Sequence, residues 1–158
     1  MDIRKARGKD LGSLERIERS SFHEERFQRW LLQSMIGEKG FLTLVALDDD
    51  EVVGYGSIHL TGPKPARVIS IAVLPERRGA GIGRSILEAM EAECESLGVA
   101  SLCLEVAISN LVALHLYVAK GYEVKGTIPG YYGEGKDAFY MVKDLSGRTR
   151  TKSKDEAF

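Results

Sequence analysis

The sequence predicts a mixed α/β (α+β) fold, with a mostly antiparallel central sheet and helices on both of its faces. Two observations support this fold class. Two apolar segments joined by the acidic turn Asp48-Asp49-Asp50-Glu51 indicate an antiparallel hairpin. A strand–helix–strand crossover then occupies the middle of the chain, around a glycine-rich turn at residues 79–83. The expected order of elements is β-α-α-β-β-β-α-β-α-β-β.

Hydrophobic periodicity sets the individual elements. Apolar segments bounded by turn residues predict strands, and apolar residues three and four positions apart predict helices. We expect strands at 3–6, 41–47, 52–60, 68–73, 101–107, 122–125 and 138–143. We expect a first helix capped by Asp10, with Leu11, Leu14 and Ile17 on its apolar face. A second helix is expected over 24–36 and ends at Gly37, and its apolar side carries Phe27, Trp30, Leu31 and Met35. A third helix carries Ile82, Ile86, Met90 and Leu97 and stops at Gly98, and a fourth is expected over 110–120.

The length and composition predict one globular domain. The chain has 158 residues, of which 44% are hydrophobic and 28% charged. We expect the domain to span residues 1–145. From position 146 the sequence is small, charged and aperiodic, which predicts a disordered C-terminal tail over 146–158.

The same numbers argue against several classes of partner. A net charge of -1 gives no field that would attract nucleic acid. No apolar run approaches the ~20 residues of a membrane span, and the first residues lack the apolar core of a signal peptide. The two cysteines, Cys94 and Cys103, show no metal or disulfide spacing, and the three histidines are scattered. We therefore expect a cytoplasmic protein without a metal; the sequence does not give its oligomeric state.

A glycine-rich turn follows the apolar strand that ends at Val73. It contains Arg77, Arg78, Gly79, Ala80, Gly81, Ile82, Gly83 and Arg84. Glycine allows positive φ and close approach of a ligand, and a helix N-terminus presents unpaired N–H groups at its positive end. With the arginines nearby, the turn predicts a phosphate site.

Two common phosphate loops do not fit. The G-x-G-x-G spacing differs from the G-x-G-x-x-G of dinucleotide-binding proteins. The stretch from Gly130 to Lys136 has Walker spacing, but Asp137 occupies the position of the magnesium-binding hydroxyl and a strand follows where a helix is needed.

The strand over 101–107 places Glu105 on the face that it shares with Cys103 and Ala107. Glu105 would be a lone carboxylate between small residues, an environment that suits a general base. Periodicity alone favours a solvated glutamate on an open face, because isolated acidic residues are mostly exposed.

Two blocks resemble the GNAT superfamily of N-acetyltransferases. The segment Arg78-x-x-Gly81-x-Gly83 resembles its acetyl-CoA loop, Q/R-x-x-G-x-G/A. A second block is similar to the N-terminal amino-acid acetyltransferase branch, which includes the ribosomal-protein alanine acetyltransferases and the archaeal Ard-type enzymes. It contains Leu104-Glu105-Val106, Ser109-Asn110, Ala113, Leu116-Tyr117, Gly121-Tyr122, Gly130-Tyr131-Tyr132, Asp137-Ala138 and Met141, and Ile71-Ala72-Val73 matches an upstream strand.

The resemblance implies a direct acetyl transfer from acetyl-CoA to the N-terminal α-amine of proteins or peptides, ribosomal proteins among the candidates. It implies that Glu105 is the general base and Tyr117 the general acid. The implied acetyl-CoA contacts are Ile71, Ala72, Val73, Arg78, Gly79, Ala80, Gly81, Ile82, Gly83, Arg84 and Asn110. The implied peptide contacts are Phe22, Glu24, Tyr131 and Tyr132. Acetylation of a lysine side chain or a small amine, and a non-catalytic acyl-CoA-binding module, remain the alternatives.

Overall fold

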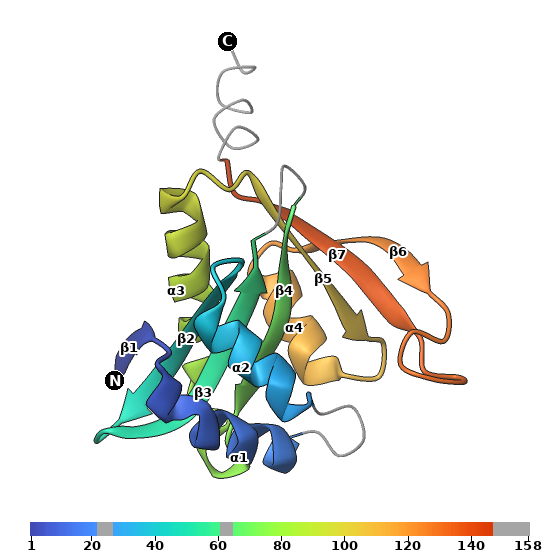
Figure 1. Ribbon diagram of the computed structural model, residues 1–158. Helices are drawn as coiled ribbons and strands as arrows, with labels where there is room; N and C mark the ends of the chain where they lie inside the picture. The colour runs from blue at the N-terminus through green and yellow to red at the C-terminus, as the bar shows by residue number, and fades with distance from the viewer. Residues whose placement is uncertain (22–26, 61–64, 147–158) are drawn as a thin grey trace. The chain divides into compact units, whose positions relative to one another are not determined.

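The computed structural model describes residues 1–21, 27–60 and 65–146 (Figure 1). The strands are β1 (Asp2–Lys5), β2 (Phe41–Asp48), β3 (Glu51–His59), β4 (Ala66–Val73), β5 (Ser101–Ala107), β6 (Glu123–Ile128) and β7 (Ala138–Asp144). The helices are α1 (Leu11–Ser21), α2 (Arg29–Gly37), α3 (Ile82–Ser96) and α4 (Leu111–Ala119), with short 3-10 turns η1 (Gly8–Asp10) and η2 (Pro75–Arg77). The chain after Ser146, where a disordered tail is expected, lies outside the described residues.

The predicted mixed sheet is confirmed. Its strands follow the hydrogen-bonding order β1-β2-β3-β4-β5-β7-β6. The pairs β1/β2, β2/β3, β5/β7 and β6/β7 are antiparallel, whereas β4 and β5 pair in parallel. The β2–β3 hairpin turns at Asp49 and Asp50, which both adopt positive φ, 48° and 66°. Aspartate tolerates this region better than most residues, so the acidic turn is suited to its sequence.

The chain forms two compact units, Met1–Gly62 with Val68–Ala92, and Pro63–Arg67 with Glu93–Phe158. In the first unit, helices cover both faces of β3. Gly54 and Gly56 face α3, because a Cβ at either position would meet Ile86. Tyr55, between them, points to the opposite face, where its hydroxyl donates to Glu18 of α1 at 2.5 Å. In the view of Figure 1, α2 passes in front of the strands of this unit.

The close approach of α3 to β3 requires the glycine at position 56. A Cβ there would lie 2.6 Å from Ile86 Cγ2 and 2.8 Å from Met90 Cε, and both side chains are fully buried. We expect Gly56→Ala to lower the free energy of unfolding by about 1–3 kcal/mol, the usual cost of overpacking. Urea denaturation measures this change in the free energy of unfolding. Gly12→Ala of α1 is the control, because the Cβ added there would have no neighbouring side chain or strand within 4 Å. An unchanged unfolding midpoint in Gly56→Ala would contradict this account of the packing.

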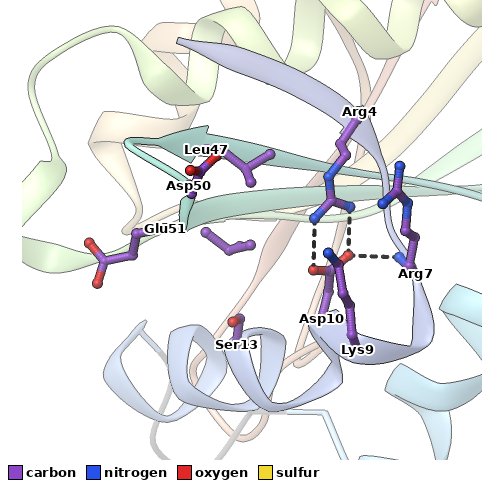
Figure 2. Close-up of a pocket in the computed structure, with 9 residues that line it drawn as sticks. Arg4, Arg7, Lys9, Asp10, Ser13, Leu47, Asp50 and Glu51 are labelled. Carbon is purple, nitrogen blue, oxygen red and sulfur yellow. Dashed lines mark hydrogen bonds and ion pairs between the residues drawn. The ribbon is translucent and has the colours of Figure 1, made fainter.

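Two sequence-based expectations for the first unit, the cap at Asp10 and the packing of Trp30, are wrong in detail. Asp10 does not cap α1, since its carboxylate turns back to accept from the Arg7 N–H at 2.7 Å and from the Arg4 guanidinium at 2.8 and 3.0 Å (Figure 2). This pairing lowers the pKa of Asp10. Trp30, which was expected on the apolar side of the second helix, is 66% exposed. Leu32 is buried there instead, as is Met35.

The second helix also begins later than expected. Its first residue is Arg29, so Phe27 precedes it, and residues 24–26 lie outside the described part of the chain. The third helix ends at Ser96, and Leu97 is exposed at its end. Gly98 follows with φ +81°, as expected of a helix stop.

The second unit is built on the antiparallel strands β5, β7 and β6. Leu102, Leu104 and Val106 of β5 are buried, as their alternation predicts. Glu105, between them, lies directly opposite Tyr140 of β7. None of the helices that the structure describes combines the length and the apolar character of a membrane-spanning helix.

Candidate functional site

The glycine turn of the first unit has the backbone geometry of an anion-binding loop. Gly79 and Gly81 adopt φ +83° and +82°, in the left-handed region. No atom lies within 4 Å of the Cβ that either glycine lacks, so open space, not protein packing, adjoins both. The positive φ explains why glycine is needed at these positions, and the open space leaves room for a ligand.

The start of α3 supplies the donors. Ser85 is the first residue here whose N–H meets a backbone carbonyl, that of Gly81 at 3.0 Å. In the described part of the chain, the N–H groups of residues 79–84 have no backbone acceptor. Gly83 lies near β4, since its absent Cβ would be 3.9 Å from both Ile71 and Val73. The structure thus brings together the predicted residues of the loop and of the end of β4, and the unpaired N–H groups at this helix start are suited to an anionic ligand.

The arginine side chains around this loop contact the protein itself. The Arg78 guanidinium donates to the Val73 carbonyl at 3.1 Å and to the Ser21 hydroxyl at 3.0 Å. Arg77 pairs with Asp48 of the hairpin, and Arg84 with Glu88 one turn along α3 at 3.3 Å. The expectation that three arginines join the backbone in one phosphate site stays a prediction, because in this structure each of the three is engaged with other groups of the protein. Within the described chain, the donors of this loop without a backbone acceptor are the N–H groups of residues 79–84.

The second unit holds the predicted general base, and Glu105 is not a lone carboxylate. The Arg67 guanidinium, from the first residues of β4, forms an ion pair with it. Arg67 pairs in parallel register with Cys103, two positions before Glu105 on the same face of β5. The Glu105 side chain is 10% exposed and that of Arg67 is 42% exposed. The carboxylate is therefore enclosed, and the guanidinium is the part of the pair that solvent reaches.

Two tyrosines of the β6–β7 loop, Tyr131 and Tyr132, border Glu105, and Tyr140 lies opposite it on β7. The Tyr132 hydroxyl donates to the Glu105 carbonyl at 3.3 Å, and Tyr131 packs edge-on against Tyr132 with ring centroids 4.8 Å apart. Burial and the charge of Glu105 raise the pKa of Tyr131. Tyr140, opposite Glu105, has its pKa raised by burial and by a hydrogen bond with Cys103.

Tyr117 lies in α4, and Asn110 is the residue just before this helix. Tyr117 is buried, with its ring edge-on to Tyr122 at 5.5 Å, and burial raises the pKa of its phenol above the usual value. It therefore remains protonated at neutral pH, as a general acid must. The Asn110 side chain caps α4 by accepting from the Ala113 N–H at 3.2 Å. The carbonyl oxygen of Asn110 has a structural role that the sequence reasoning did not anticipate.

Arg67 and Tyr140 are the neighbours of Glu105 that sequence reasoning missed. The contact between Arg67 and Glu105 follows from the register in which β4 and β5 pair. Alternation within a single strand does not contain this register. Phe22 and Glu24, the other expected peptide contacts, lie outside the described residues. Among the described residues, no group of three or more histidine, cysteine, aspartate or glutamate side chains could hold a metal ion.

A cavity of about 520 Å³ in the first unit contains none of the predicted site residues. It lies between η1, β1 and the β2–β3 turn, and it is lined mostly by charged side chains (Figure 2). Arg4 and Asp10 in its wall bind each other, and Asp50 and Glu51 lie on the hairpin side. Its charges are mixed in sign, which favours no single class of ligand.

The sheet and the glycine loop opening α3 are features of an acyl-CoA-dependent transferase. Residues 9–122 match the acetyltransferase (GNAT) family, and the chain belongs to this family of N-acetyltransferases. It is 35% identical over 146 residues to an uncharacterised N-acetyltransferase of Methanocaldococcus jannaschii, covering 90% of this chain and 91% of that one. It is 34% identical over 155 residues to an N-alpha-acetyltransferase of Sulfurisphaera tokodaii, covering 90% and 92%.

A solved structure gives the same result. The ribosomal-protein-S18-alanine N-acetyltransferase from Escherichia coli superposes with a TM-score of 0.83 at 28% identity, over 92% of this chain and 94% of that one. The predicted resemblance to the acetyltransferases, and to their N-terminal amino-acid branch, is confirmed.

Proposed function

We propose that this chain acetylates the N-terminal α-amine of proteins or peptides, with Glu105 as the general base and Tyr117 as the general acid. The observation that carries the proposal is the enclosed Glu105 carboxylate bordered by the Tyr131–Tyr132 loop. A base beside two aromatic loop residues suits a substrate that presents an amine next to a peptide backbone.

Each residue has a defined task. Acetyl-CoA supplies the acetyl group as a thioester. Glu105 takes, directly or through a water, the proton that the substrate ammonium must lose before its nitrogen can form the new C–N bond. Tyr117, which stays protonated at neutral pH, gives a proton to the sulfur as the C–S bond breaks. No acyl-enzyme is needed.

The α-amine is a better match for a carboxylate base than lysine is. Its pKa is about 7.7–8.0, against about 10.4 for a lysine side chain. Removing its proton at neutral pH therefore costs much less free energy. Lysine or small-amine acetylation by the same residues is the second candidate, and the tyrosine loop favours the peptide over it.

The acetyl-CoA contacts are proposed on the geometry of the first unit. Backbone groups of residues 71–73 would hold the acetyl end, and the N–H groups of residues 79–84 the pyrophosphate. Arg78 would fix the loop through Val73, with Arg84 near the phosphates. Asn110, which belongs to the second unit, stays a predicted contact of the pantetheine arm. Phe22 and Glu24 stay predicted peptide contacts.

We further propose that residues 1–145 act as one acetyltransferase domain. The family match over residues 9–122 includes parts of both compact units, which supports this proposal. The S18-alanine specificity named for the E. coli enzyme makes ribosomal proteins the first substrates to test. We place the reaction in the cytoplasm, with which two buried cysteines that form no disulfide are compatible.

Two synthetic peptides test the function. One has a free N-terminus and no lysine, and the other has a blocked N-terminus and one internal lysine. With acetyl-CoA, mass spectrometry should find acetylation of the first peptide at its α-amine and little of the second. Efficient acetylation of the lysine would assign the second candidate function, and binding of acetyl-CoA without turnover of any amine would indicate a non-catalytic module.

The tyrosine loop should determine affinity for the peptide. We expect the double variant Tyr131→Ala/Tyr132→Ala to raise the peptide KM roughly 10- to 30-fold, the usual cost of truncating aromatic contacts. Affinity for acetyl-CoA, measured by calorimetry, should stay near wild type. The matched double phenylalanine variant keeps the rings and removes the hydroxyls, so it separates packing from hydrogen bonding. A double alanine variant with unchanged peptide KM would place the peptide elsewhere.

A further inference from the structure

The ion pair between Arg67 and Glu105 is unequal in its exposure. Glu105 is the enclosed member, and Arg67 keeps 42% of its side chain accessible. The hydrogen bond to Glu105 is also the main reason that the pKa of Arg67 is raised. The Arg67 guanidinium therefore contacts Glu105, the proposed base, and is still accessible to a ligand.

Among the residues that the structure describes, Glu105 is the one carboxylate that acts on the charge of Arg67. The other groups that act on its charge are Cys103 and Tyr131, neither of which is a carboxylate, and the pKa of the Tyr131 phenol is raised. Tyr140, across the strand pair from Glu105, is likewise a neutral phenol with a raised pKa. Among the described groups that act on Arg67, one carboxylate balances one guanidinium.

Binding of a substrate changes this balance. The α-ammonium of a peptide must come to Glu105 to lose its proton, so two cations then share one carboxylate. The substrate ammonium and the Arg67 guanidinium repel each other when both lie beside Glu105, and this repulsion is strongest where solvent is scarce. A carboxylate carried by the substrate would relieve it. The planar guanidinium can hold such a group with two parallel hydrogen bonds.

We propose that Arg67 is a specificity-determining residue that favours substrates with an acidic side chain at their first or second position. In the free protein it occupies Glu105, and the arriving ammonium takes over that carboxylate while Arg67 binds the acidic side chain. Consecutive Cα atoms are about 3.8 Å apart, so only the first residues of a peptide stay near its α-nitrogen. This inference rests on the proposed acetylation of N-terminal amines.

Matched peptides measure the preference. One pair begins with Asp or Asn and is otherwise identical, and a second pair begins with Ala and carries Glu or Gln at position two. For wild-type protein, we expect kcat/KM to be about tenfold higher for the acidic member of at least one pair, mainly through KM. In Arg67→Gln the ratio should fall to one or below. In Arg67→Lys, which keeps the charge but loses the fork, an intermediate ratio is expected.

Lys125→Gln is the control. It removes the same charge from an exposed residue of β6 that pairs with Glu123, and it should leave the ratio unchanged. Equal rates for the acidic and amide peptides in wild type, or a preference that survives in Arg67→Gln, would overturn the inference while the proposed function stands. Absence of α-amine acetylation on all four peptides would instead count against the proposed function itself.

Discussion

Replacing Glu105 by glutamine should lower kcat/KM for a free-N-terminus peptide by roughly 10²–10⁴-fold, the usual contribution of a general base. Glutamine has nearly the same size and keeps an oxygen that can accept from Arg67, so the ion-paired neighbour retains a hydrogen-bond partner. Affinity for acetyl-CoA should stay near wild type. The defect should be largest at lower pH, because fewer α-amines are then neutral, and should shrink as the pH rises past about 8.

Steady-state kinetics across pH, with a single peptide, measure this result. Glu123→Gln is the matched control, since it removes a carboxylate from an exposed residue of β6 whose partner is Lys125. It should change kcat/KM less than twofold at every pH, within the scatter of such rates. If Glu105→Gln retains most of its kcat/KM over the whole range, the base is another group or the amine arrives already neutral.

The second large effect is expected at Gly81. A valine there would have to hold φ near +82°, a conformation that costs side-chain-bearing residues about 1–2 kcal/mol, and its β-carbon would enter the open space beside the loop. The turn would either relax or crowd the ligand. We expect the Kd for acetyl-CoA, measured by calorimetry, to rise on the order of 10- to 100-fold through lost charge-assisted hydrogen bonds.

The chain offers a close control for backbone strain. Gly98 has φ +81°, no atom within 4 Å of its missing Cβ, and a place at the end of α3 instead of its start. Gly98→Val should therefore lower stability by a similar amount to Gly81→Val and leave acetyl-CoA binding intact. Equal affinity in a folded Gly81→Val variant would exclude this loop as the pyrophosphate site.

Local chemistry explains why much of the fold could be predicted. The β2–β3 hairpin follows from its acidic turn, and β5 has the bounds that alternation gives. The second helix could not be placed as well. Its apolar residues fit more than one face, and only packing against the strands decides that Leu32 is buried and Trp30 exposed. Tertiary contacts override such local patterns.

The candidate site shows the same division. Gly79 and Gly81 were predictable, because a positive φ is a property of the residue and its turn. The interaction partners of the charged residues Arg78 and Glu105 could not be predicted from the sequence. Arg78 binds Val73 and Ser21, and Glu105 is paired with Arg67, 38 residues earlier. Pairing at such separation depends on strand register, which the spacing of residues within one segment does not contain.

The β6–β7 loop is held together by its own hydrogen bonds. The Tyr132 N–H donates to the Lys136 carbonyl at 3.0 Å, the Gly133 N–H to the Gly130 carbonyl at 3.1 Å, and the Gly130 N–H to Asp137 at 2.9 Å. None of these bonds uses the side chain of Tyr131 or Tyr132. A new side chain at position 131, which is exposed, can therefore appear without rebuilding the loop, whereas the Tyr132 hydroxyl also ties the loop to the Glu105 carbonyl. A lineage carrying this scaffold could change which N-termini it modifies by single substitutions, keeping its acetyl donor and its chemistry throughout.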